Sequence, residues 1–262
     1  MRRLGLLIAL MLGLAACAAP ELRLSSRFSA GEVRLYRVIA DAEVTISAAD
    51  LTSTERTRLE ATTRVVVEQV TPTTTLTMTI TPVTLTRDGK QVDPPPEQKV
   101  VIEVGSDGQI DRVTPAEGTG ELDAAQVEDL VPLIGPPLPA GRVRLAERWT
   151  RPIPAASGTS AGVQEARLAA LKVVNGYDCG IVAISTRRPV VREREVAGTA
   201  LRLEGVEYAA GEIAFAFREG LPVTVRSNGE ARLAISGGPA AGGGVVIRSN
   251  SVLTLIRRTG AA

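Results

Sequence analysis

Apolar and polar residues alternate with a period of two along most of the chain after residue 32. The stretch from Val33 to Ser47 places its apolar side chains on one face: Tyr36, Val38, Ala40, Ala42, Val44 and Ile46. The same alternation recurs in residues 55–70, 73–81, 223–235 and 245–258. A period of two is typical of strands with one buried face and one solvated face. The pattern therefore predicts a protein built mainly of half-buried strands.

Turn dipeptides separate these stretches at positions that favour hairpins. Asp88-Gly89, Asp107-Gly108 and Asn175-Gly176 are pairs that adopt positive φ easily in tight turns. The second turn would join 99–104 to 109–114, and the third would join 166–174 to 179–187. Neighbouring strands are therefore expected to pair in antiparallel fashion.

One short segment has helical spacing instead. Val127, Leu130 and Val131 follow the i, i+3, i+4 pattern of one helix face, and Pro132 blocks continuation of the helix. We expect a helix over about 122–131.

The predicted fold class is mainly β, with a large curved antiparallel sheet and one short covering helix. Such a sheet must bury its apolar face by curling or by folding onto itself. A half-barrel is the first expectation, and a sandwich is the alternative. We assign residues 32–262 to a single antiparallel β domain, because no linker is long enough to divide them.

The first residues have the layout of a signal peptide. Arg2 and Arg3 precede an apolar run from Leu4 to Leu14, which has 11 residues. That run is too short for a membrane-spanning helix, which needs about 20 residues, but it suits the apolar region of a signal peptide. We expect residues 1–16 to be removed as the signal peptide and residues 17–31 to form a tether.

The four residues Leu14, Ala15, Ala16 and Cys17 resemble the bacterial lipobox at every position. The resemblance implies that Cys17 carries a diacylglycerol, that cleavage occurs just before it, and that its amino group receives an acyl chain such as palmitate. The protein would then be a lipoprotein of the cell envelope whose partner is the membrane that holds these chains. In a Gram-negative cell, Ala18 would favour the outer membrane, facing the periplasm. An ordinary signal peptide with a cysteine there by chance is the alternative.

Composition removes several classes of function. The 262 residues include no histidine and two cysteines, and the net charge is +1. Catalysis by Ser-His-Asp or Cys-His is therefore excluded, as is an imidazole metal ligand. Removal of the signal peptide leaves 28 basic and 29 acidic side chains, a balance that gives no reason to expect nucleic acid as a partner. Cys179 then lacks a partner thiol in its chain, and its apolar neighbours predict a buried, unreactive side chain.

The sequence offers no persuasive catalytic, cofactor or metal site. Gly158 to Gly162 matches the G-x-S-x-G pattern of a nucleophile elbow, but the required histidine is missing and prolines precede the match. We read this segment as a loop and predict no enzyme activity, no cofactor and no metal.

The arrangement as a whole looks like that of a group of bacterial envelope lipoproteins. The features that carry the resemblance are the lipobox, the segment Ile102–Ile110, the short helix with its proline-rich exit, Trp149-Thr150 and the long C-terminal hairpin. The coarse plan is also similar to the LolA- and LppX-like half-barrels that carry lipids across envelopes. These likenesses imply an apolar or lipid ligand on the concave face. The alternative is a structural or protein-interaction lipoprotein with a solid core.

Overall fold

We describe the protein from a computed structural model. The structure covers residues 21–48, 51–71, 73–105, 110–116, 138–153, 162–196, 199–237 and 241–260, which are called the described residues below. These residues are mainly β-strand, and no helix occurs among them. The helix expected over 122–131 lies outside the described residues, as do the lipobox and the turn at Asp107-Gly108.

The described residues contain fourteen strands. Their bounds are β1 (Leu22–Arg23), β2 (Val33–Ala48), β3 (Leu51–Gln69), β4 (Thr74–Arg87), β5 (Lys90–Val92), β6 (Gln98–Val104), β7 (Ile110–Pro115), β8 (Arg142–Val143), β9 (Arg148–Ile153), β10 (Gly162–Val174), β11 (Tyr177–Val196), β12 (Thr199–Ala216), β13 (Leu221–Ser236) and β14 (Gly244–Thr259).

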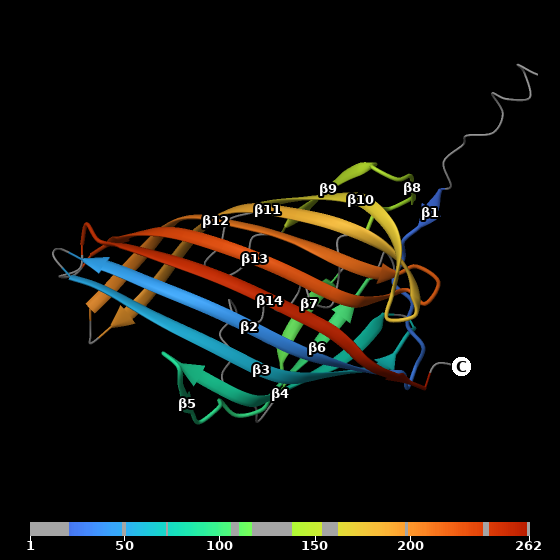
Figure 1. Cartoon of the computed structure of the whole chain (residues 1–262), viewed down its shortest axis with the longest axis horizontal. Coiled ribbons are helices and arrows are strands. Elements are labelled where there is room, and N and C mark those ends of the chain that lie inside the picture. Colours follow the sequence, from blue (N-terminus) through green and yellow to red (C-terminus); the bar gives the residue numbers. More distant parts are fainter. Residues whose placement is uncertain are drawn as a thin grey trace, which may run out of the picture.

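Twelve of these strands form one antiparallel sheet (Figure 1). Its order is β7-β6-β4-β3-β2-β14-β13-β12-β11-β10-β9, and β5 pairs with β4 beside this path. Most neighbours in space are neighbours in sequence, as in a meander. The exceptions are the pairing of β6 with β4, which skips the short β5, and the pairing of β14 with β2, which joins the last strand to the first long one at the centre of the sheet.

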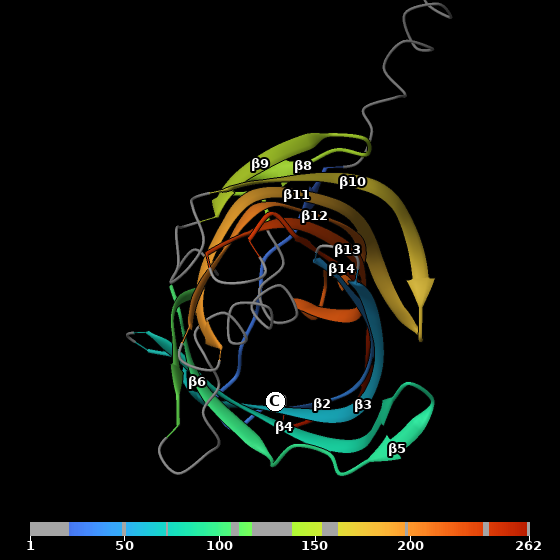
Figure 2. The ribbon, with the colours of Figure 1, turned by 90° about the vertical axis from the view of Figure 1, so that its left-hand side faces the viewer.

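The sheet curls strongly about its long axis, as Figure 2 shows in a view along that axis. The edge strands β7 and β9 are not hydrogen-bonded to each other, so the sheet stays open. The half-barrel expectation is therefore confirmed, and the sandwich alternative is wrong, because one continuous sheet curls on itself.

The alternation seen in the sequence fixes which side chains lie inside the curl. Tyr36 and Val38 on β2 are buried, and the intervening Arg37 is exposed. We call the face that carries Tyr36 and Val38 the inner face and the opposite one the outer face. The hairpin turns also form as expected, with φ of 50° at Asn175 and 82° at Gly176.

The described part of the expected tether packs on the domain. Leu22 and Arg23 pair with Val143 and Arg142 in a separate two-stranded sheet. Leu24 is buried against the core. Its side chain lies beside Gly180, and a larger residue at position 180 would fill that space. The globular part therefore begins about ten residues earlier than the alternation indicates.

Candidate functional site

The inner face is most densely packed at the end of the curl where β2 begins and β14 ends. Apolar side chains from most of the long strands meet here, and the largest fully buried ones include Phe215, Leu76, Met78, Ile102 and Leu168. A cavity beside Tyr36 and Met78 has a volume of only about 10 Å³, which is about the space of one water molecule. This end is therefore a nearly solid core.

An ionic cluster lies at the same end. Arg34 Nε donates to Glu32 Oε1 over 2.8 Å, and Arg258 Nε donates to the same oxygen over 2.7 Å. Glu32 is fully buried, Arg34 is 4% exposed, and the Arg34 guanidinium lies over the Phe28 ring. Burial raises the pKa of Glu32, but the hydrogen bonds and charges of the two arginines outweigh it and leave the pKa below its usual value.

Next along the curl, the inner face is made of very small side chains. They form two rows of directly paired residues across β2, β14, β13 and β12, with no member larger than serine: Ala42, Ser249, Gly229 and Ala209 in one row, and Ala40, Ser251, Ser227 and Gly211 in the other. We call these eight residues the inner belt. Ser227 Oγ and Ser251 Oγ are 2.7 Å apart, so one of these hydroxyls donates a hydrogen bond to the other.

Beyond the belt the inner face becomes apolar again. Val190, Leu233, Ile235 and Val245 are buried there, in a second cluster separate from the main core. Partly buried side chains continue this cluster onto neighbouring strands: Val44, Leu201, Leu203, Ala231 and Ile247. Ile46 lies further along the same face of β2 and is 45% exposed. The inner face thus carries apolar side chains on both sides of the belt.

One ion pair lies on the inner face beside the belt. Arg188 Nε donates to Glu207 Oε2 over 2.8 Å, and the two side chains are 10% and 24% exposed. Sequence reasoning missed this pair, because charged side chains on a half-buried strand are ordinarily expected on its solvated face. The signal was present, since Arg188 shares its parity with the buried Val182 and Val190.

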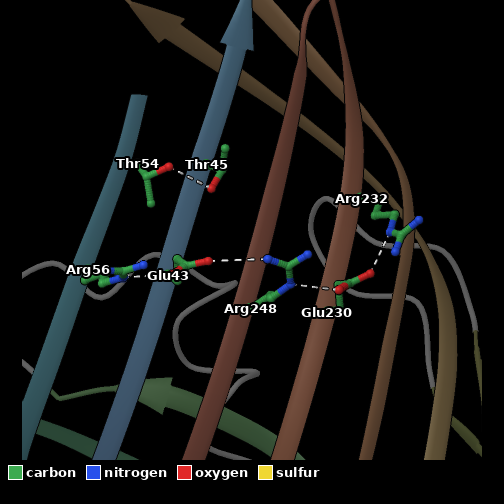
Figure 3. A network of polar contacts seen from close by, with 7 residues as sticks. All are labelled: Glu43, Thr45, Thr54, Arg56, Glu230, Arg232 and Arg248. Carbon is green, nitrogen blue, oxygen red and sulfur yellow. Dashed lines mark hydrogen bonds and ion pairs between the residues drawn. The ribbon is translucent and has the colours of Figure 1, made fainter. Parts of the chain in front are cut away.

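The outer face carries a chain of alternating charges across the centre of the sheet (Figure 3). Arg56 donates to Glu43, and Arg248 bridges Glu43 and Glu230, which also accepts from Arg232. The hydrogen bonds from Arg56 and Arg248 respectively hold the pKa values of Glu43 and Glu230 below their usual range. These groups are open to solvent, so each pair contributes little to stability.

A wide hollow of about 910 Å³ lies on the outer face across β10 to β14. Its lining includes Tyr208, whose ring lies 5.7 Å from the Arg187 guanidinium carbon, and the paired Glu230 and Arg248. Three of its charged groups are therefore already engaged with neighbours in the sheet. This arrangement favours a solvated polar surface over a site that recognises a charged ligand.

The structure places only some of the candidate residues from the sequence. Cys17 and the flanking Leu14, Ala15 and Ala16 lie outside the described residues. Cys179 is a free, buried cysteine, as expected, and burial raises the pKa of its thiol to about 11. Trp149 is half-buried against the main core.

The described residues contain no helix long and apolar enough to cross a membrane and no group of three or more Cys, Asp or Glu side chains that could hold a metal ion.

Comparison with known proteins identifies the fold but no family. No family model and no curated protein matches the chain. The chain is similar in fold to lipovitellin, in a solved structure that concerns lipid–protein interactions in that protein. The TM-score is 0.51 and the sequence identity is 14%. The match covers 90% of this chain, which spans about a quarter (26%) of the length of the lipovitellin chain. An outer membrane channel from Pseudomonas putida F1 matches over 88% of this chain and 98% of its own, with 9% identity and a TM-score of 0.37, too low to carry an argument.

Proposed function

We propose that this protein is a membrane-anchored envelope lipoprotein whose curled sheet binds an elongated apolar ligand, such as a lipid acyl chain, on its inner face. The observation that carries the proposal is the inner belt. Its eight residues on four adjacent strands are no larger than serine, whereas the neighbouring rows carry valine, leucine and isoleucine, so a ligand would find space beside the sheet at this level.

The dimensions of the belt suit a chain-like ligand. From the row that contains Val38 to the row that contains Val44 is six residues, or about 20 Å along the strand. Transfer of apolar groups from water to this surface contributes about 0.8 kcal/mol for each CH₂ that is buried. Because Ser227 and Ser251 share a hydrogen bond, an apolar chain that lies over them leaves at most one of the two hydroxyl protons without a partner.

The ion pair of Arg188 and Glu207 gives the proposed site a polar end. The pair lies beyond the row of Ala42 and Ala209, on the same inner face. A polar headgroup attached to the apolar chain could exchange hydrogen bonds with these side chains without entering the apolar cluster. The proposed ligand is therefore amphipathic, with its chain on the belt and its head towards Arg188.

The similarity to lipovitellin supports this proposal at the level of fold. That protein is described in terms of its lipid–protein interactions, and its matching part is a similar sheet. A shared fold does not by itself establish a shared function, so the argument rests on the belt.

A structural role without a ligand is the second candidate, and the solid packing of the main core favours it. The cavity beside Tyr36 and Met78 holds no more than about one water, so this end of the curl has no room for a ligand. The two candidates make different predictions for substitutions in the belt. Such a substitution changes ligand binding only if a ligand binds there.

A pair of neighbouring substitutions on β14 separates them. Ser249 belongs to the inner belt, and Asn250, the next residue on the strand, points to the opposite face. We expect Ser249→Leu to reduce the affinity for a fluorescent fatty-acid probe at least tenfold, because the larger side chain occupies the space for the chain. Asn250→Leu should leave the affinity unchanged. Equal affinities in the wild type and both variants, or no saturable binding at all, would favour the structural role.

A further inference from the structure

The domain carries exposed apolar side chains at the end from which the predicted lipid anchor leaves. Leu171 and Val173 lie near the tip of the β10–β11 hairpin and are 44% and 70% exposed. Leu145, just after β8, is 52% exposed. We call these three residues the anchor-side patch. Residues 171 and 173 share a parity, so both side chains leave the same face of the hairpin.

The patch is continuous with the N-terminal segment. Leu171 pairs with Gly180, and a side chain at Gly180 would meet Leu24 at 3.3 Å. Leu145 is likewise fixed beside this segment, because its neighbour Arg144 forms an ion pair with Glu21 over 2.7 Å. Figure 1 shows β1, β8 and the start of β11 at the same end of the molecule.

The predicted anchor keeps this end close to a membrane. Only three residues lie between Cys17 and Glu21, where the described chain begins, so the two are four residue steps apart. A fully extended chain covers at most about 3.6 Å per residue, so Glu21 lies within about 14 Å of the acylated residue. A tether this short leaves the rest of the domain few orientations relative to the bilayer surface.

We infer that the anchor-side patch rests on the lipid surface, with Leu171 and Val173 inserted at the level of the headgroups. The inference depends on acylation of Cys17, which is part of the proposed function. Insertion removes these side chains from water and adds apolar contacts to those of the acyl chains. It also sets the orientation of the sheet, because the opposite end, at Ser47, is roughly 35 Å further along the strands from Tyr36. The second apolar cluster, which contains Val190 and Leu233, then lies on the side away from the membrane.

Depth-dependent quenching of a fluorophore tests the inference on the full lipidated protein. A Val173→Cys variant is labelled with an environment-sensitive dye, and Ser47→Cys at the opposite end is the matched control. Cys17 is blocked by its lipid and Cys179 is buried, so the introduced thiol is the one that reacts. The proteins are placed in vesicles of phosphatidylethanolamine and phosphatidylglycerol, with or without brominated acyl chains.

We expect brominated lipid to reduce the fluorescence at position 173 at least twofold and to leave position 47 unchanged. Flotation of the vesicles is measured on the same samples. Protein that floats but shows no quenching at position 173 overturns the patch alone. Protein that does not float contradicts the anchor, and with it the patch. Equal quenching at both positions also overturns the proposed orientation.

Discussion

Removal of the Glu32 carboxylate should be among the most damaging single changes in the chain. The substitution Glu32→Ala leaves Arg34, which is 4% exposed, without the ion pair that compensates its burial. Arg258, which is 19% exposed, loses the same partner. Breaking a buried pair by removing one member costs about 3–5 kcal/mol. Because Arg258 reaches solvent and Arg34 keeps its contact with Phe28, we expect a loss of about 3 kcal/mol in the free energy of unfolding.

Urea unfolding followed by the fluorescence of Trp149 measures this loss. Trp149 is the only tryptophan and is half-buried against the main core, so its emission reports on the folded state. The matched control is Glu60→Ala, which removes solvent-accessible ion pairs with Arg37 over 2.9 Å and with Arg58 over 3.5 Å. That change should cost less than about 1 kcal/mol.

The pH dependence gives a second test of the same cluster. The folded pKa of Glu32 lies below its unfolded value, so its contribution to stability is complete above about pH 4.5 and is lost as the pH falls through the folded pKa. The difference between the wild type and Glu32→Ala should therefore narrow in acid. A loss under 1 kcal/mol at pH 7, or a difference that does not change with acid, would refute the assigned role.

Three further changes have specific expected outcomes. The Cys179 thiol, with its pKa raised to about 11 by burial, should not react with a disulfide reagent at pH 8 until urea is added; rapid reaction of the native protein would contradict the burial. Gly205→Ala would place its Cβ 1.9 Å from the Arg232 carbonyl oxygen and should cost about 2 kcal/mol in urea unfolding, whereas Gly141→Ala, with nothing within 4 Å, should be tolerated; equal stability of the two variants would show that β12 adapts. Metabolic labelling with palmitate should mark the wild type and not Cys17→Ser, and label retained in the variant would rule out the lipobox assignment.

The local structure was predictable because side chains on the two faces of a strand alternate along the sequence with a period of two. Tyr36 and Val38 are buried on the face assigned to them, and the Asn175-Gly176 turn has the dihedral angles that its residues favour. These features depend on residues a few positions apart, so a single sequence contains the information needed to predict them.

The site depends on pairings between distant segments, which alternation cannot reveal. Ala42 and Ser249 become neighbours because β14 pairs with β2, although about two hundred residues separate them. Each small residue alone is unremarkable in its strand, and the belt exists only after four strands align their small residues. The early start of the domain at Leu24 was missed for a similar reason, because its burial depends on space beside Gly180.

Native mass spectrometry of the full lipidated protein, extracted gently from its membrane, tests the central claim most directly. We predict a population whose mass exceeds that of the acylated chain by one lipid, and we predict that this population is lost in Ser249→Leu and retained in Asn250→Leu. A single species at the mass of the acylated chain, in the wild type and in both variants, would contradict a lipid site on the inner belt.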